Sequence, residues 1–187
     1  KITMRKLTLL AAALMVQGCN IELQNAPDRV ELELGDSTSF TISGKVIDDY
    51  VENARVCLDT NQNSSCESFE PSAITNADGE YEINFEGRYD PTKFELISEI
   101  NSQSTDSRHG AFEKDFIMST KAALTDNANI TPFTTLQLDD DSLLEDLAEQ
   151  LGISYTGGTD YIEQGNEDIA DLARTLTKSI EELSDGL

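Results

Sequence analysis

Oxygen-bearing side chains recur at regular intervals in one segment of the chain, residues 59–70. Counted from the first residue, they fall at positions 1, 3, 5, 9 and 12, and position 7 can add its backbone carbonyl. The residues in these places are Asp59, Asn61, Asn63, Ser65, Glu67 and Glu70. Alternate residues of a tightly curled backbone point inward, and a final glutamate can close the shell with two oxygens. The spacing therefore predicts a site for a hard cation of high coordination number.

Calcium fits this loop better than magnesium, because magnesium prefers a smaller octahedral shell. Only three of the ligands are carboxylates, which predicts a moderate affinity, near that of the weaker extracellular calcium modules. The loop departs from the EF-hand pattern at position 6, where Ser64 stands in place of glycine, and it follows a predicted strand rather than a helix. The alternative is a turn rich in asparagine and serine that a disulfide closes without a metal.

The first 18 residues have the features of an export signal. Arg5 and Lys6 precede an apolar run, residues 7–16, which is too short to span a bilayer as a stable helix. The run leads into the sequence Val-Gln-Gly-Cys at residues 16–19, which resembles the lipobox of bacterial lipoproteins. An ordinary secretory signal followed by an incidental cysteine is the alternative.

The lipobox resemblance implies cleavage before Cys19 and attachment of lipid to that cysteine. Asn20, the next residue, is not the aspartate associated with retention in the inner membrane. We therefore expect the chain to be anchored by lipid in the outer membrane and to face the periplasm or the cell surface. Three acyl chains anchor a protein far more firmly than the marginal binding of a single chain.

Acidic residues dominate the composition, with 36 Asp and Glu against 13 Lys and Arg and a formal net charge of −23. Residues 1–18 hold three basic residues and no acidic one, so their removal makes the remaining chain more acidic still. Such a surface repels phosphate backbones, which excludes nucleic-acid binding. The charge is compatible with calcium binding and equally with solubility alone.

The cysteines and the histidine limit the chemistry further. With Cys19 assigned to lipid, Cys57 and Cys66 form an even pair in an oxidising compartment, which predicts a disulfide. His109 is the one histidine of the chain and lies in a polar segment, so we expect a surface residue and no histidine-based metal site. The adjacent acids Asp48 and Asp49 are interpreted as a solvated turn.

Alternating apolar and polar residues predict short β-strands, and later the apolar spacing changes to a helical one. Strands are expected in segments 40–47, 54–58, 81–85, 94–100 and 112–117, with a tight turn at Asp78-Gly79. A capping box at Ser142 and Glu145 begins a predicted helix that ends before Gly152. Asn166 caps a second predicted helix, whose apolar stripe runs from Ile169 to Leu183.

These patterns predict a mainly β fold, an Ig-like or transthyretin-like antiparallel β-sandwich followed by a small α-helical region. The expected organisation is a signal peptide at 1–18, a lipid-anchored tether at 19–38, a β-sandwich module at 39–120, and a linker with a helical region at 121–187. Two helices alone make a thin core, so we expect the chain to be the N-terminal part of a longer protein.

Several segments between residues 39 and 137 are similar to modules of known bacterial surface proteins. They are residues 44–46, 53–63, 66–67, 70–73 and 75–81, which hold an Asp-x-Asn-x-Asn loop and a Thr-x-x-x-Gly-x-Tyr turn. These segments resemble SdrD B-type and carboxypeptidase-regulatory-like (transthyretin-like) modules, and residues 130–136 are similar to a segment that follows such modules in exported lipoproteins. The resemblance implies a β-sandwich that serves as a stalk, spacer or adhesive unit and is stiffened by calcium.

The expected function is that of a non-enzymatic cell-envelope lipoprotein, whose disulfide- and calcium-stiffened sandwich is a structural, spacer or adhesive module. No nucleophile elbow, phosphate-binding glycine loop or histidine zinc motif is present in the sequence, so no catalytic residue is predicted. The alternative is an accessory N-terminal part of a larger secreted enzyme. Carbohydrate binding is less favoured, because the chain lacks tryptophan and its tyrosines are scattered.

Overall fold

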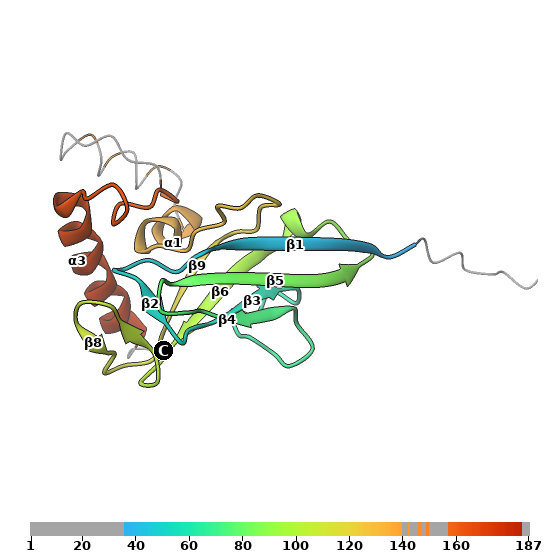
Figure 1. Cartoon of the computed structure of the whole chain (residues 1–187), viewed down its shortest axis with the longest axis horizontal. Helices are drawn as coiled ribbons and strands as arrows, with labels where there is room; N and C mark the ends of the chain where they lie inside the picture. Colours follow the sequence, from blue (N-terminus) through green and yellow to red (C-terminus); the bar gives the residue numbers. More distant parts are fainter. Residues whose placement is uncertain (1–35, 140–141, 143–145, 147–148, 150–156, 185–187) are drawn as a thin grey trace, which may run out of the picture. The chain divides into compact units, whose positions relative to one another are not determined.

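The computed structural model describes residues 36–139, 142, 146, 149 and 157–184, which belong to one compact unit, Gly35–Leu187. The fold is mainly β, as predicted, and a small helical region follows the strands (Figure 1). Neither of the two helices named in this part of the chain is long and apolar enough to cross a membrane. The predicted signal peptide and Cys19 lie outside the described residues.

Three antiparallel sheets are formed by the described strands. β1 (Thr38–Lys45) pairs with β5 (Glu80–Gly87) along its whole length. The largest sheet has the order β4 (Ser72–Ile74), β3 (Arg55–Asp59), β6 (Glu95–Ile100) and β9 (Phe116–Lys121). The third sheet joins three short strands that were not predicted, β2 (Val51–Glu52), β7 (Thr105–Asp106) and β8 (Gly110–Ala111).

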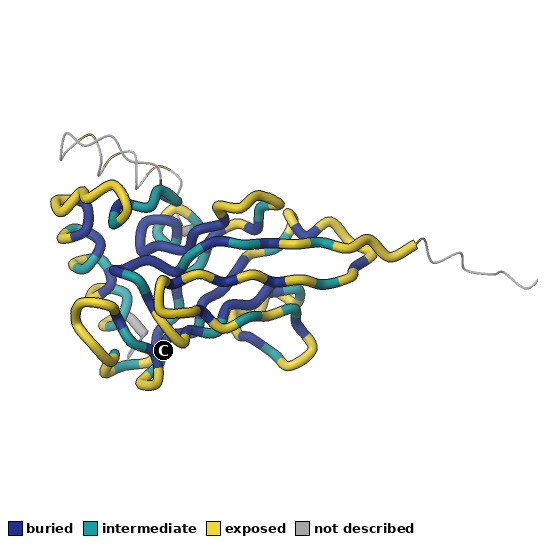
Figure 2. Tube along the Cα trace, in the orientation of Figure 1, coloured by how far each residue is buried: buried dark blue, intermediate teal, exposed yellow. Residues whose placement is uncertain are grey.

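The hydrophobic core lies between the β1–β5 pair and the four-stranded sheet. Inward-facing side chains of the two layers form one cluster, which includes Ile42, Ile83, Leu58, Leu96 and Met118. In β5 the buried positions alternate with exposed ones, as the sequence pattern predicts for a strand with one solvated face. Figure 2 shows this alternation along β1 and β5 and the exposed loop that follows β3.

The second edge of β1 is closed by the segment around residue 128. The amide of Ala128 donates to the carbonyl of Ser43 at 3.0 Å, and the amide of Ile130 donates to Lys45 at 2.8 Å. A Cβ atom on Gly44 would lie 2.5 Å from the carbonyl oxygen of Ala128. Glycine is therefore required here by the close approach of two backbones, and the hydroxyl of Tyr81 donates to the same Ala128 oxygen.

Two helices follow the strands, α1 (Pro132–Asp139) and α3 (Glu167–Ser184). The start of α3 agrees with the prediction, because the side chain of Asn166 accepts a hydrogen bond from the Ile169 amide at 3.2 Å. α1 was not predicted; it begins with proline at its first position, where the missing amide costs nothing, and Thr131 caps it. The helix predicted from Ser142 lies mostly outside the described residues.

The helices are joined to the sandwich by a second hydrophobic cluster. Its buried members are Ile47, Phe133, Tyr161, Ile169, Ala170 and Ala173. The hydroxyl of Tyr161 lies 2.9 Å from the carbonyl of Ile47 and 2.8 Å from that of Asp48. This cluster fixes α3 against the chain that leaves β1, and so it positions the turn at residues 48–49.

Candidate functional site

The predicted cation loop is closed by the predicted disulfide. Cys57 of β3 and Cys66 are bonded to each other, and their Cα atoms lie 5.7 Å apart. Both cysteines are buried, and they pack against Ile97 of β6. The loop that leaves the end of β3 is therefore tied back to the same strand and covers one face of the four-stranded sheet.

Two charged side chains of the sheet hold the backbone near Cys66. The guanidinium of Arg55 donates to the carbonyls of Cys66 and Glu67, both at 2.8 Å. The carboxylate of Glu99 accepts the amide of Cys66, also at 2.8 Å. The second half of the loop is thus fixed to β3 and β6 by direct hydrogen bonds, independently of the disulfide.

Asp59, the first predicted ligand, is only 3 % exposed. Its two carboxylate oxygens accept the amides of Asn63 at 3.1 Å and Ser64 at 2.9 Å. The side chain of Asn61 accepts the same Asn63 amide at 3.1 Å. These bonds curl the first half of the loop around the Asp59 carboxylate, as a cation-binding loop of this spacing requires.

The backbone at Ser64 has φ of 58°, in the left-handed region that favours glycine. This is the position at which the EF-hand pattern calls for glycine. The chain therefore makes the turn that the pattern needs, although serine has to adopt a conformation that is costly for a residue with a Cβ atom. Gln62, with φ of 59°, adopts the same conformation two residues earlier.

The two glutamates of the loop are used differently. Both oxygens of Glu70 are hydrogen-bonded: one accepts the amide and hydroxyl of Thr60, and the other accepts the amide of Glu67. One oxygen of Glu67 accepts the Asn63 side-chain amide. The other, Oε2, is buried and has no hydrogen-bond partner. A buried carboxylate oxygen without a donor is unfavourable, and a bound cation would satisfy it.

The loop therefore brings all the predicted ligands into one hydrogen-bonded turn, and its donor set of carboxylate, amide and carbonyl oxygens suits calcium. The carboxylates of the loop are not, however, the side chains whose ligand atoms lie closest together. Among the described residues, the three side chains of Asp, Glu, His or Cys whose ligand atoms all lie within 4.8 Å are Asp49, Asp106 and His109.

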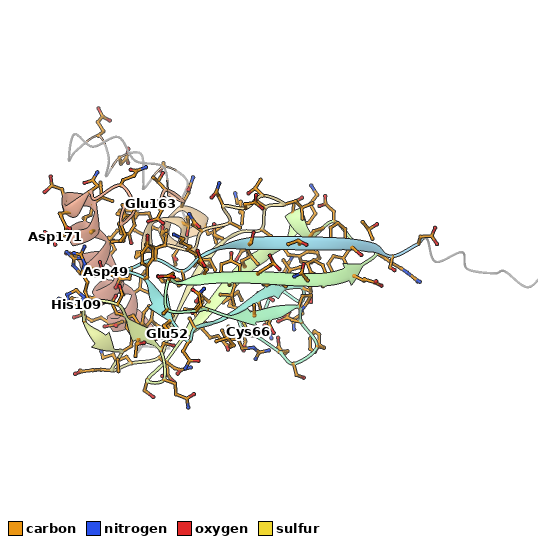
Figure 3. All side chains as sticks on the ribbon, viewed as in Figure 1. Asp49, Glu52, Cys66, His109, Glu163 and Asp171 are labelled. Atoms are coloured by element: carbon orange, nitrogen blue, oxygen red, sulfur yellow. A yellow bond between two sulfur atoms is a disulfide. The ribbon has the colours of Figure 1, made fainter. Side chains whose placement is uncertain are left out.

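This second group lies where the turn after β1 meets the β7–β8 hairpin and α3. The Nδ1 atom of His109 lies 3.1 Å from Asp106 Oδ1 and 3.4 Å from Asp49 Oδ2. Asp49 is fully buried, and Arg108 and Arg174 contact its carboxylate at 3.2 and 3.3 Å. Figure 3 shows Asp49 and His109 beside α3, well away from Cys66 in the other loop.

Asp48 adjoins this group and is 6 % exposed. The pKa of its carboxyl is raised to about 7, mainly by burial and also by the negative charges of Asp106 and Asp49, against the opposing effects of Thr177 and Arg174. The interpretation of Asp48 and Asp49 as a solvated turn is therefore wrong. The hydroxyl of Tyr161 donates to the carbonyl of Asp48, and the second hydrophobic cluster packs against this turn.

The sequence pattern did not reveal the group of Asp49, Asp106 and His109. Asp49 and Asp106 are 57 residues apart in the chain, although the amide of Asp49 donates to Asp106 at 3.2 Å. A local signal existed in the spacing of Asp106 and His109, because an aspartate that begins a turn accepts the amides that follow it. Here Asp106 Oδ1 accepts the amides of Arg108 and His109 at 2.8 and 2.7 Å.

Comparison with family models, with curated proteins and with solved structures gives no match to this chain. The functional conclusions below therefore depend on the residues and their geometry.

Proposed function

We propose that this protein is a non-enzymatic lipoprotein of the cell envelope, whose β-sandwich is a spacer or adhesive module stiffened by a disulfide and by calcium. The single observation that carries the proposal is the loop at residues 59–70. It combines a covalent closure, an oxygen donor set of the right spacing, and a buried carboxylate oxygen of Glu67 that has no partner.

Calcium in this loop would stiffen the module at a specific place. Asp59 is the last residue of β3, and Glu70 precedes the chain that enters β4, so a cation shared by both side chains would join two neighbouring strands at their ends. A ligand that binds only the folded protein stabilises it by mass action. Stiffening of this kind suits a module that has to hold its shape in an extracellular or periplasmic medium.

The envelope location is supported by the export signal and the Val-Gln-Gly-Cys sequence at residues 16–19. The pair of Cys57 and Cys66 is in keeping with it, because structural disulfides form and persist in oxidising compartments. We infer that the lipid at Cys19 holds the protein to the outer membrane, and that the acidic sandwich extends from it toward a protein or surface partner.

The calcium part of the proposal is tested by thermal unfolding of the full chain in a mild detergent, first in excess EDTA and then in millimolar Ca²⁺. We expect calcium to raise the melting temperature of the wild type by several degrees, and Asp59→Ala to abolish that rise. Asp126→Ala, which removes an exposed acid outside the loop, should keep it. An equal response of the two variants, or no response of the wild type, would refute the calcium site.

The lipid part is tested separately, by labelling with an alkyne-tagged palmitate in a Gram-negative host. The wild type should take up the label and fractionate with the outer membrane, and Cys19→Ser should do neither. A wild-type chain that reaches the periplasm without label would refute lipid anchoring. Residues 1–18 would then be an ordinary secretory signal, and Cys19 an incidental cysteine.

A further inference from the structure

The group of Asp49, Asp106 and His109 has the geometry of a metal-binding donor set. Nδ1 of His109 faces one oxygen of each carboxylate, at 3.1 Å for Asp106 and 3.4 Å for Asp49. Bonds of about 2.0 to 2.2 Å at tetrahedral angles separate neighbouring donor atoms by about 3.3 to 3.6 Å. Nδ1 of His109 thus lies near this spacing from both carboxylates, and all three donor atoms lie within 4.8 Å of one another.

The surrounding charges also favour a cation. Two guanidinium groups are shared among several carboxylates: Arg108 contacts Asp49 and Glu167, and Arg174 contacts Asp49 and Asp171. Asp48 and Asp106 add two more buried acids to the same cluster. Carboxyl groups therefore outnumber the guanidinium groups that contact them, and the cluster can accept a further positive charge.

An unsatisfied oxygen points to the same conclusion independently of the group itself. Asp48 Oδ1 is buried and has no hydrogen-bond partner, in a residue that is 94 % buried. Asp48 lines a cavity of about 360 Å³ together with Asp106, His109, Arg174 and Thr177. His109 forms part of the entrance, since its side chain is 60 % exposed. An ion can therefore reach the donor atoms from solvent.

We propose that Asp49, Asp106 and His109 bind a divalent transition-metal ion of the Zn²⁺ class, in the cavity that Asp48 also lines. An imidazole nitrogen with carboxylate oxygens suits Zn²⁺, whereas Ca²⁺ takes oxygen ligands. Arg108 would stay ion-paired with Asp49 and orient it, as outer partners of metal ligands do. The ion would tie the β7–β8 hairpin to the turn after β1, at a site separate from the calcium loop.

The test uses the fact that His109 is the one histidine of the chain, so a single imidazole spin system reports on the site. Zn²⁺ is titrated into the chelator-treated full chain, with isothermal calorimetry for affinity and ¹⁵N-edited NMR for the imidazole. We expect one ion per chain, and a shift of the Nδ1 resonance that shows metal at Nδ1 and a proton at Nε2.

Variants separate this site from the loop. His109→Gln should weaken Zn²⁺ binding at least tenfold while leaving the calcium response of the melting temperature unchanged. Asp59→Ala should abolish the calcium response and leave Zn²⁺ binding unchanged. Asp115→Asn, at an exposed acid outside both sites, should change neither. Unchanged His109 resonances at excess Zn²⁺, or equal Zn²⁺ affinity in wild type and His109→Gln, would overturn the proposal and leave Asp49, Asp106 and His109 as a structural ion network.

Discussion

The carboxylate of Glu70 joins the beginning and the end of the loop through Thr60. Its Oε1 accepts the Thr60 amide at 2.7 Å and the Thr60 hydroxyl at 3.1 Å, while its Oε2 accepts the Glu67 amide at 3.1 Å. Glu70 is 4 % exposed, so these bonds are shielded from water. The residue predicted to complete a calcium shell therefore also holds the loop closed by hydrogen bonds alone.

We therefore expect Glu70→Gln to destabilise the protein even in EDTA. The amide group would present a donor to one of the amides that the carboxylate now accepts, which leaves a buried backbone donor unsatisfied at a cost of about 1 to 3 kcal/mol. Urea unfolding of the two proteins measures the difference. Glu86→Gln, on an exposed residue of β5, should stay within about 0.5 kcal/mol of wild type; an equally small effect at Glu70 would contradict the closure.

The disulfide should contribute measurably although its loop is short. Cys57 and Cys66 are separated by 9 residues, for which loop-closure entropy gives about 2 to 3 kcal/mol. The double variant Cys57→Ala/Cys66→Ala should unfold at correspondingly lower urea concentration. Reduction of the wild type should have a similar effect, whereas a reductant should leave the stability of the double variant unchanged, since that variant lacks the bond.

The raised pKa of Asp48 predicts that the stability of the fold decreases as pH rises. Its folded pKa of about 7 lies above the ordinary 3.8, so the folded protein binds one more proton than the unfolded chain between these values. Stability from this group is therefore present at low pH and is lost as pH rises toward 7, by about 1.4 kcal/mol per pH unit. Burial is the main cause of the raised pKa; Asp106 and Asp49 add to it, and Thr177 and Arg174 oppose it.

The measurement is urea unfolding in EDTA from pH 4.5 to pH 8, for wild type and Asp48→Asn. Relative to wild type, the variant should gain stability across this range by roughly 2 to 4 kcal/mol, because an amide does not ionise. Asp115→Asn serves as the exposed control and should parallel the wild type. Parallel curves for Asp48→Asn and wild type would show that Asp48 ionises normally.

Substitution of Gly44 by alanine tests the close approach of β1 to the segment around residue 128, and the same substitution at Gly158 is its control. A Cβ on Gly44 would meet the Ala128 carbonyl oxygen at 2.5 Å, whereas nothing lies within 4 Å of a Cβ on Gly158. Gly44→Ala has to push two backbones apart, and we expect a loss of about 1 to 3 kcal/mol, the usual cost of overpacking. Gly158→Ala should be nearly neutral. Equal melting temperatures for the two variants would contradict the close approach.

The strands were predictable because one face of each is solvated. In β5 the sequence alternates between apolar and polar residues, and the structure buries the apolar ones against the other layer. Asn166 marked the start of α3 for an equally local reason, since a capping side chain acts on the next turn. α1 was missed because Pro132 and two threonines weaken the helical pattern, and the packing of Phe133 against Tyr161 compensates.

The cation loop was predictable from the sequence and the burial of Asp48 and Asp49 was not, because only the loop depends on local spacing. The spacing of oxygens at 59–70 is local, so the sequence shows it, and the structure confirms the disulfide that closes it. Whether Asp48 and Asp49 lie in water or in the interior depends on Tyr161, which is 113 residues from Asp48. No property of an Asp-Asp pair indicates such a distant partner, and charge alone predicts the solvated alternative.

The closure of β1 by the segment around residue 128 delays completion of the sandwich until that segment can fold back onto β1. β1 emerges first, its cross-strand partner Asn84 follows Thr41 by 43 residues, and its other edge is covered only when Ala128 and Ile130 arrive. Contacts so distant in the chain form slowly, because a long loop must close first. Until residues 128–130 pair with β1, the chain therefore exposes an unpaired strand edge, which can pair with the edges of other chains.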